Sequence, residues 1–432
     1  MGVTNVWYIL NLRESPFFQD PLDPTTGGQY PIRLFVGRDE EAEHILRGMG
    51  SAPHSRHAIQ GPPGVGKTTL VQYIKAQVAE DGWLADANAI PVTSTTTAEE
   101  LLVRILASVH DALGARDETL LQQPPMQEVR QLLALERERS ASGSIGLPLI
   151  GSLGAGTASQ RFTGPGALMV QPTRLLRELN DLAHRHLQSP GILIHLNNLE
   201  NITEADQKEA ARIIRDLRDQ ALMYPGFHFV LAGTDDAIRT IVAEQEQLRS
   251  IFSNPGSLRP LGISQLHALL ELRYSYLRVD DTRPSIEPVT KLAVENLYKL
   301  FDGNLRGTLH ALDEAAKILV GRGEDPTEPM SLERMAPVLF RIYHAKMHAD
   351  LTAAQVSHLT TIASRWPAGV ITPGATEKVL HLKRNPTYTL FSELVRKGYL
   401  TDAGRAQTGR PGRPEQQYAL TGQARLALGA FS

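Results

Sequence analysis

The 432-residue sequence contains no cysteine, so disulfide bonds and metal sites built from thiolates are excluded. It also contains no apolar run of the roughly 18 residues that a membrane helix needs. Residues 1–20 have neither the basic start nor the small-residue cleavage site of a signal peptide. These absences predict a cytoplasmic protein that does not associate with membranes. The length of the chain predicts roughly two to four domains.

The net charge of −3 gives no reason to expect the whole chain to bind nucleic acid, but the basic residues are distributed unevenly. From Leu351 to the C-terminus, ten lysines and arginines outnumber four acidic residues. A local excess of positive charge is typical of a surface that contacts phosphates. The C-terminal region is therefore a candidate for binding double-stranded DNA.

One stretch, residues 59–70, matches the G-x-x-x-x-G-K-[ST] pattern of a phosphate-binding loop. Its glycines let backbone N–H groups surround a phosphate, Lys67 supplies a cation for the β and γ oxygens, and the Thr68 hydroxyl can ligate Mg²⁺. A short strand before the loop and a helical pattern after it favour this interpretation over a Gly/Pro-rich turn that matches by chance. The sequence thus predicts ATP and Mg²⁺ as cofactors, with contacts from Gly61, Pro62, Pro63, Gly64, Val65, Gly66, Lys67, Thr68 and Thr69.

A second nucleotide motif is expected at the end of the apolar strand Ile192–Leu196, where P-loop ATPases carry Asp-Glu. This sequence has Asn197 and Asn198 instead. Asparagine can hydrogen-bond a water bound to Mg²⁺, so Asn197 remains a candidate at the metal site, but an amide cannot accept a proton as a base. We therefore expect ATP to bind and to be hydrolysed slowly, with Glu200 as a nearby substitute carboxylate.

Strands and helices alternate over residues 31–255, which predicts a parallel sheet flanked by helices. Within this region, residues 140–166 are rich in Gly and Ser and interrupt the helical pattern. Such a composition is typical of a hairpin or mobile loop. It can be a surface insertion, which we favour, or a pore loop or partner-contacting loop.

The C-terminal pattern predicts helices over residues 353–364, 374–382 and 386–397, followed by a β-hairpin. This is the element order of a winged helix-turn-helix. The third helix and the Gly/Arg/Pro-rich wing would read DNA, although a winged helix can also contact proteins. The predicted DNA contacts are Lys383, Arg384, Thr387, Tyr388, Ser392, Arg396, Arg405, Arg410 and Arg413.

Five segments occur in the order seen in AAA+ ATPases: residues 34–41, the P-loop, the strand that ends at Asn198, Gly233-Thr234, and the run Gly-Asn-Leu-Arg at 303–306. With the C-terminal winged helix, the chain resembles the origin-recognition initiator clade and the ATPases that regulate DNA transposition. The resemblance implies an N-terminal arm (1–30), a nucleotide-binding domain (31–255), a helical lid (256–345) and a winged helix-turn-helix domain (346–432).

The resemblance also implies roles for single residues. Val36, Gly37 and Arg38 would lie over the adenine base. Thr234 would be a first sensor of the γ-phosphate, and Arg306 a second sensor supplied by the lid. Arg249 is the best placed of three arginines, with Arg239 and Arg259, to act as a finger in a neighbouring subunit's site.

Two functions remain open from the sequence. The first is a DNA-binding ATPase switch that self-associates when it binds ATP. The second is a nucleotide-gated signalling or assembly ATPase of a bacterial defence or mobile-element system, in which the winged helix contacts a protein partner. A steep salt dependence of DNA binding would favour the first.

Overall fold

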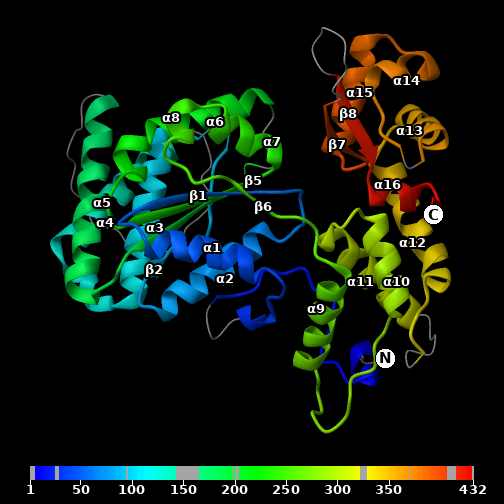
Figure 1. Cartoon of the computed structure of the whole chain (residues 1–432), viewed down its shortest axis with the longest axis horizontal. Coiled ribbons are helices and arrows are strands. Elements are labelled where there is room, and N and C mark those ends of the chain that lie inside the picture. The colour runs from blue at the N-terminus through cyan, green and yellow to red at the C-terminus, as the bar shows by residue number, and fades with distance from the viewer. Residues whose placement is uncertain are drawn as a thin grey trace. The chain divides into compact units, whose positions relative to one another are not determined.

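The computed structural model describes residues 5–24, 29–93, 96–142, 165–197, 199, 204–321, 328–367, 369–405 and 415–430. The chain forms two compact units (Figure 1). One is continuous and comprises Pro21–Arg259, and the other joins the two ends of the chain, Met1–Asp20 and Pro260–Ser432. We call them the continuous unit and the terminal unit.

The continuous unit is built on a parallel sheet, as predicted from the sequence. Its strands are β1 (Ser55–Gln60), β2 (Leu84–Ala85), β3 (Ile90–Pro91), β4 (Ile192–Asn197), β5 (Phe227–Gly233) and β6 (Gly256–Ser257). Among the described residues their order is β2-β4-β5-β1-β6, with β3 also pairing with β4. All these pairs are parallel. Because the longest strands are central and apolar, helices must cover both faces of the sheet.

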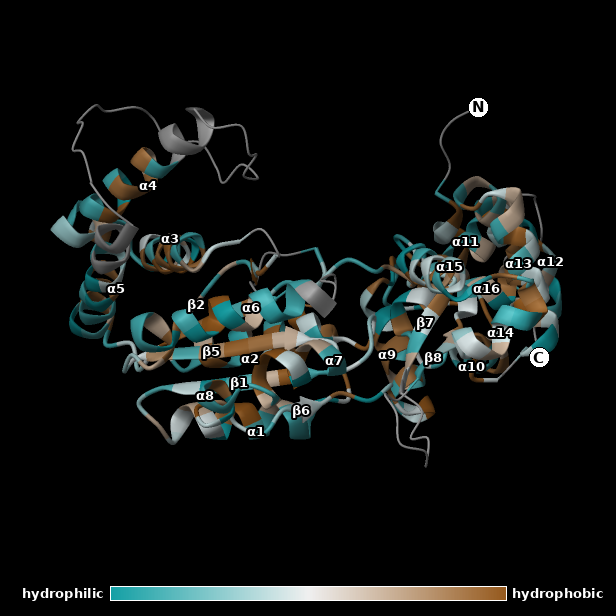
Figure 2. Cartoon of the chain, turned by 90° about the horizontal axis from the view of Figure 1, so that it is seen from above, coloured by the Kyte–Doolittle hydropathy of each residue, from teal (hydrophilic) through white to brown (hydrophobic). Residues whose placement is uncertain are grey.

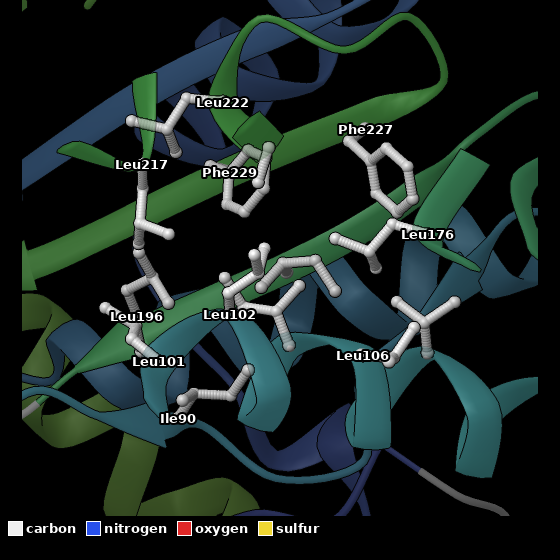
Figure 3. Packing of buried hydrophobic residues seen from close by; sticks show 14 of the residues in the cluster. Ile90, Leu101, Leu102, Leu106, Leu176, Leu196, Leu217, Leu222, Phe227 and Phe229 are labelled. Carbon is white, nitrogen blue, oxygen red and sulfur yellow. The ribbon is translucent and has the colours of Figure 1, made fainter. Parts of the chain in front are cut away.

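The helices of this unit cover the two faces of the sheet. They are α1 (Asp39–Gly50), α2 (Lys67–Glu80), α3 (Ala98–Arg116), α4 (Pro124–Ser142), α5 (Pro165–Leu187), α6 (Glu204–Asp216), α7 (Asp235–Ile238) and α8 (Glu246–Arg249). Phe227 and Phe229 of β5 belong to one buried cluster with Leu102 and Leu106 of α3 (Figure 3). The next residue along β5, Val230, belongs instead to the cluster that contains α1 and α2. Successive side chains of β5, which is mainly brown in Figure 2, therefore pack against helices on opposite faces of the sheet.

The segment from Glu204 to Leu222 contains two different kinds of helix. After α6 the chain forms a short π-helical turn over Arg218–Leu222. Within it the Leu222 N–H donates to the carbonyl of Leu217, five residues back, and both of these side chains are fully buried. The wider turn thus turns two leucines toward the same core, which a regular helix does not do at this spacing.

In the terminal unit the N-terminal arm is anchored to the helices that follow Pro260. A 3₁₀ turn, Val6–Leu10, buries Trp7 and Leu10, and Asn11 in the left-handed region donates its side-chain amide to the carbonyls of Asp280 and Arg283. The helices of this part are α9 (Ile263–Tyr276), α10 (Lys291–Leu300), α11 (Leu305–Gly321) and α12 (Leu332–Asp350).

The C-terminal part has three helices followed by an antiparallel hairpin. The elements are α13 (Ala353–Arg365), α14 (Pro373–Leu380), α15 (Arg384–Arg396), β7 (Leu400–Arg405), β8 (Gln416–Leu420) and a last helix, α16 (Gly422–Ala427). Ile371, between α13 and α14, pairs with Tyr418 through two backbone hydrogen bonds of 2.7 Å. The hairpin is therefore extended by a third segment of backbone. Within the described residues, no helix combines the length and apolar character of a membrane span.

Candidate nucleotide-binding site

The phosphate-binding loop connects β1, which ends at Gln60, to α2, which begins at Lys67. Gly64 and Gly66 have φ angles of 77° and 98°, in the left-handed region that favours glycine. A side chain at Gly61 would place its Cβ 2.6 Å from the carbonyl oxygen of Leu258. The loop conformation thus depends on glycine at these positions, as the pattern predicts.

Lys67 lies in the first turn of α2 and is only 3% exposed. Its Nζ donates to the carbonyl oxygens of Gly61 and Pro62, at 2.9 and 3.0 Å. The cation is therefore held against the loop that would surround a phosphate, and a phosphate can replace these carbonyls as its partner. The N-terminus of a 14-residue helix adds backbone N–H groups at the same place. This donor set fits a nucleotide phosphate.

The strand register brings the other predicted nucleotide residues to the same edge of the sheet. Gln60 pairs with Gly233, and Leu196 pairs with Leu231. Because β1, β4 and β5 are parallel, the residues that follow them emerge at one edge, beside the P-loop. Asn197 ends β4 and is half-buried there. Asn198 and Glu200 lie outside the described residues.

Thr234 is the N-cap of the short helix α7. Its Oγ1 accepts a hydrogen bond from the Ala237 N–H at 3.3 Å, so its hydroxyl hydrogen can still be donated elsewhere. Thr68, beside Lys67, is half-buried and has a hydroxyl of the type that ligates Mg²⁺ in such loops. The chain therefore has candidate groups for both a metal ion and a phosphate sensor at this edge.

The segment before α1 packs against α2. The ring of Phe35 stacks on that of Tyr73, with centroids 4.4 Å apart, and Val36 and Gly37 are half-buried. Arg38 is almost completely buried and donates to the Val65 carbonyl of the P-loop at 3.3 Å and to Glu41 at 3.1 Å. The guanidinium predicted to lie over adenine thus has protein groups as its partners in the structure.

The arginines predicted to sense or complete an ATP site differ in their surroundings. Arg249 ends α8, and its exposed side chain forms no hydrogen bond or ion pair with the described residues. Arg239 pairs with Asp236 at 2.5 Å and with Glu244 at 3.4 Å. Arg306 is exposed in the first turn of α11, in the terminal unit, so its role as a second sensor stays a prediction.

A buried ion pair beneath the P-loop was not found from the sequence. Lys75 of α2 lies 2.9 Å from Asp86, and their side chains are 2% and 0% exposed. Burial raises the pKa of Asp86 to about 6, against the opposing effect of Lys75. The second carboxylate oxygen accepts the His195 N–H of β4 at 3.1 Å. Burial also lowers the pKa of the His195 imidazole well below its usual value.

Asp86 fills a gap in the hydrogen-bonding pattern of β4. The backbone of β2 pairs with β4 at Ile192 and Leu193, and β3 pairs with it from Leu196 onward. Between these two contacts the carboxylate of Asp86 supplies the acceptor for the β4 N–H that neither strand reaches. A single aspartate in a loop gives no sequence signal for this role, because the role depends on the pairing of distant strands.

The predicted DNA contacts on α15 fall into two groups. Lys383, Arg384, Ser392 and Arg396 are exposed. Thr387 is fully buried, and its hydroxyl donates to the Lys383 carbonyl at 3.0 Å, so it packs the helix and is not on the exposed face. Tyr388 is half-buried, with the Arg384 guanidinium 5.8 Å from its ring centroid.

Two further exposed polar residues of the same helix, Asn385 and Thr389, are not among the predicted DNA contacts. They lie one turn apart, and the Thr389 hydroxyl donates to the Asn385 carbonyl at 3.1 Å. Arg405 ends β7, and the wing residues Arg410 and Arg413 lie outside the described residues.

Residues 34–224 match the family model of the AAA ATPase domain. With its glycine-dependent P-loop and parallel sheet, the continuous unit therefore has the AAA+ ATPase fold predicted from the sequence. Among curated proteins, none matches this chain.

Solved structures to which this chain is similar include the Aeropyrum pernix ORC1 protein in complex with DNA, with 13% identity, 92% of each chain covered and a TM-score of 0.46. The Aeropyrum pernix ORC2 protein in ADPNP-ADP complexes has 15% identity, 96% of each chain covered and a TM-score of 0.46. A point variant of Thermotoga maritima RuvB has 14% identity, with 90% of this chain and 94% of that chain covered, and a TM-score of 0.42.

Proposed function

We propose that this protein is an ATP-binding AAA+ switch that assembles on DNA, or regulates events on DNA, through its C-terminal helices and hairpin. The observation that carries the proposal is the P-loop, in which the buried Lys67 ammonium, the left-handed glycines and the start of α2 converge on one site. A cation and several N–H groups held together in this way are suited to a polyphosphate.

In this proposal the chain's own residues divide the work at the nucleotide. Lys67 exchanges its loop carbonyls for the β and γ oxygens, and Thr68 supplies a ligand for Mg²⁺, which neutralises phosphate charge when bound. Asn197 orients a water on the metal from the tip of β4. Because neither Asn197 nor Asn198 can take a proton, hydrolysis is slow, and the bound state persists long enough to serve as a signal.

The proposed DNA surface is the exposed face of α15 with the arginines of the hairpin. Lys383 and Arg384 lie at the start of the helix and Arg396 at its end, with exposed Ser392 between them. Basic residues at the ends suit phosphates, and polar residues in the middle suit base edges. The three-helix and hairpin order supports a winged helix-turn-helix.

One purified sample tests both parts of this proposal. ATP binding is measured by calorimetry with Mg²⁺ present, and duplex DNA binding by fluorescence anisotropy over a range of salt concentrations. We expect both ligands to bind and DNA affinity to fall steeply with salt. A sample that binds DNA without ATP affinity would contradict the switch, and absence of DNA binding at low salt would contradict the DNA role.

A second candidate is the signalling or assembly ATPase of a defence or mobile-element system. The observation that favours it is a group of apolar side chains on the terminal unit, where Tyr8, Ile9 and Val279 are 61%, 55% and 56% exposed. Exposed apolar groups this large are suited to a protein partner. This function gains support if the protein binds ATP, lacks affinity for duplex DNA and self-associates with ATP.

A further inference from the structure

Arg38 is 6% exposed although it is an arginine, and a guanidinium removed from water needs partners for its N–H groups. Its Nη1 donates to the Glu41 carboxylate at 3.1 Å. Its Nη2 donates both to the Val65 carbonyl at 3.3 Å and to the Arg259 carbonyl. One side chain thus connects the start of α1, the P-loop and Arg259, which lies shortly after β6.

The segment 256–259, which we call the connecting segment, also lies directly against the P-loop. The Leu258 N–H donates to the Gln60 carbonyl at 2.8 Å, immediately before the loop begins. The Leu258 carbonyl occupies the space that a side chain at Gly61 would need. The connecting segment therefore contacts the first residues of the loop directly, and Leu258 belongs to the same buried apolar cluster as Val65. Arg38 adds a polar connection between Val65 and Arg259.

Arg259 is also the last residue of the continuous unit, and Pro260 is the first residue of the main part of the terminal unit. Arg38 binds the backbone carbonyl of Arg259, and the Arg259 side chain is exposed. The contact with Arg38 therefore does not depend on which residue type stands at position 259.

We infer that Arg38 is a positioning residue that couples the conformation of the P-loop to the connecting segment, so that binding of ATP orders the chain where one unit continues into the other. The inference rests on the proposed function, because it needs ATP at this P-loop. When Lys67 leaves the carbonyls of Gly61 and Pro62 for a phosphate, the loop backbone adjusts. The double donation by Nη2 carries that adjustment from Val65 to Arg259.

The experiment is hydrogen exchange of the full chain with and without Mg²⁺ and ATP, followed in peptides from the P-loop and from the connecting segment. In the parent protein ATP should slow exchange in both peptides. In Arg38→Met, ATP should still slow exchange in the P-loop, whereas the slowing in the connecting segment should fall by about tenfold, the effect of one charge-assisted hydrogen bond. Arg47→Met is the matched control, because it removes an exposed guanidinium that pairs with Glu43 on the same helix, and it should behave as the parent does.

Glu41→Gln is a second variant, in case Arg38→Met does not fold, because it keeps the guanidinium and removes its charged partner. It should reduce the slowing in the connecting segment and leave the slowing in the P-loop intact. If either folded variant keeps the parent's response in both peptides, the coupling through Arg38 is wrong. If ATP slows exchange in neither peptide of the parent, ATP does not bind at this P-loop and the proposed function is wrong as well. The variants therefore test the coupling, and the parent protein tests the proposed function.

Discussion

The carboxylate of Asp86 and the ammonium of Lys75 form an ion pair of 2.9 Å in a place where neither side chain is more than 2% exposed. Buried charges of this kind are costly to leave alone and are tolerated as a pair. The pair joins the P-loop helix to the loop that supports β4. Its removal should therefore affect the fold before it affects the chemistry.

We expect Asp86→Ala to lower the free energy of unfolding by about 3 to 5 kcal/mol, because it leaves the Lys75 charge buried without a partner. Replacing both residues, as Lys75→Met with Asp86→Leu, should restore most of this loss. Glu271→Ala, which breaks the exposed pair with Lys291, is the control and should cost less than about 1 kcal/mol. Urea denaturation measures all three, and a small effect of Asp86→Ala would show that the pair is not buried in solution.

Acid should destabilise the protein between pH 6.5 and 4. The pKa values of His57 and His228 are lowered to about 4, in both cases mainly by burial, so the unfolded chain takes up protons in this range and the folded chain does not. One pKa unit corresponds to about 1.4 kcal/mol, so each histidine contributes about 3 kcal/mol at most. Burial lowers the pKa of His195 as well, which adds to this trend, and the raised pKa of Asp86 opposes it below pH 6.

Unfolding free energies measured from pH 7 to pH 4 test this expectation. The two imidazoles are connected through the Ser55 hydroxyl, which lies 2.8 Å from His228 Nδ1 and 3.1 Å from His57 Nε2. His228→Gln should make the dependence on pH shallower by about one proton. A flat profile for the parent protein would mean that these rings reach solvent.

Lys67→Ala should weaken ATP binding by about a hundredfold or more, because it removes the cation that the loop holds in place for the phosphates. Lys208 of α6 is exposed, and Lys208→Ala is the matched control, with affinity unchanged. Calorimetry with Mg²⁺ and ATP makes the comparison. Equal affinities for Lys67→Ala and the parent would remove the P-loop assignment.

The two asparagines after β4 should limit turnover and leave binding intact. Asn198→Glu should raise the rate of ATP hydrolysis by about a hundredfold if a missing base is the limit. Glu200→Ala should abolish the residual rate if Glu200 is the substitute. Phosphate release under single-turnover conditions gives both rates. Rapid hydrolysis by the parent that Glu200→Ala does not change would place the second motif on other residues.

ATP should promote self-association, and Arg249→Ala should abolish the effect of ATP while the protein stays folded. Arg249 has no partner among the described residues, whereas Arg239 is held by two carboxylates. Arg239→Ala is therefore the comparison and should retain the response. Light scattering at micromolar protein with a non-hydrolysable ATP analogue measures it. A monomer under all conditions would contradict a finger that acts between subunits.

Much of the fold could be predicted because its elements have strong local signals. β4 and β5 are continuous apolar runs, and Gly64 and Gly66 of the P-loop have positive φ angles that favour glycine. The two-residue strands β2 and β6 have no periodicity to detect, and only their pairing with longer strands defines them. Local pattern therefore predicted the central strands of the sheet and did not predict β2 and β6.

The site was predictable where chemistry depends on residue type and not where it depends on burial. Lys67 and Thr68 have roles fixed by the motif. Arg38 and Thr387 were predicted to contact ligands, yet burial directs the first to backbone carbonyls and the second into the packing of α15. The sequence does not show whether a polar residue faces solvent or the interior. Tertiary packing therefore decides which partners its side chain has.

The division of the terminal unit between the two ends of the chain has a consequence for synthesis on the ribosome. Residues 21–259 form a continuous segment that can fold as soon as it has emerged. The arm must wait, because the carbonyls of Asp280 and Arg283 that bind Asn11 are made some 270 residues later. Until then the helices after Pro260, which belong to the same unit as Trp7 and Leu10, have not been made. A nascent chain stalled before residue 280 should thus carry a folded ATPase domain behind an exposed apolar arm that chaperones can bind.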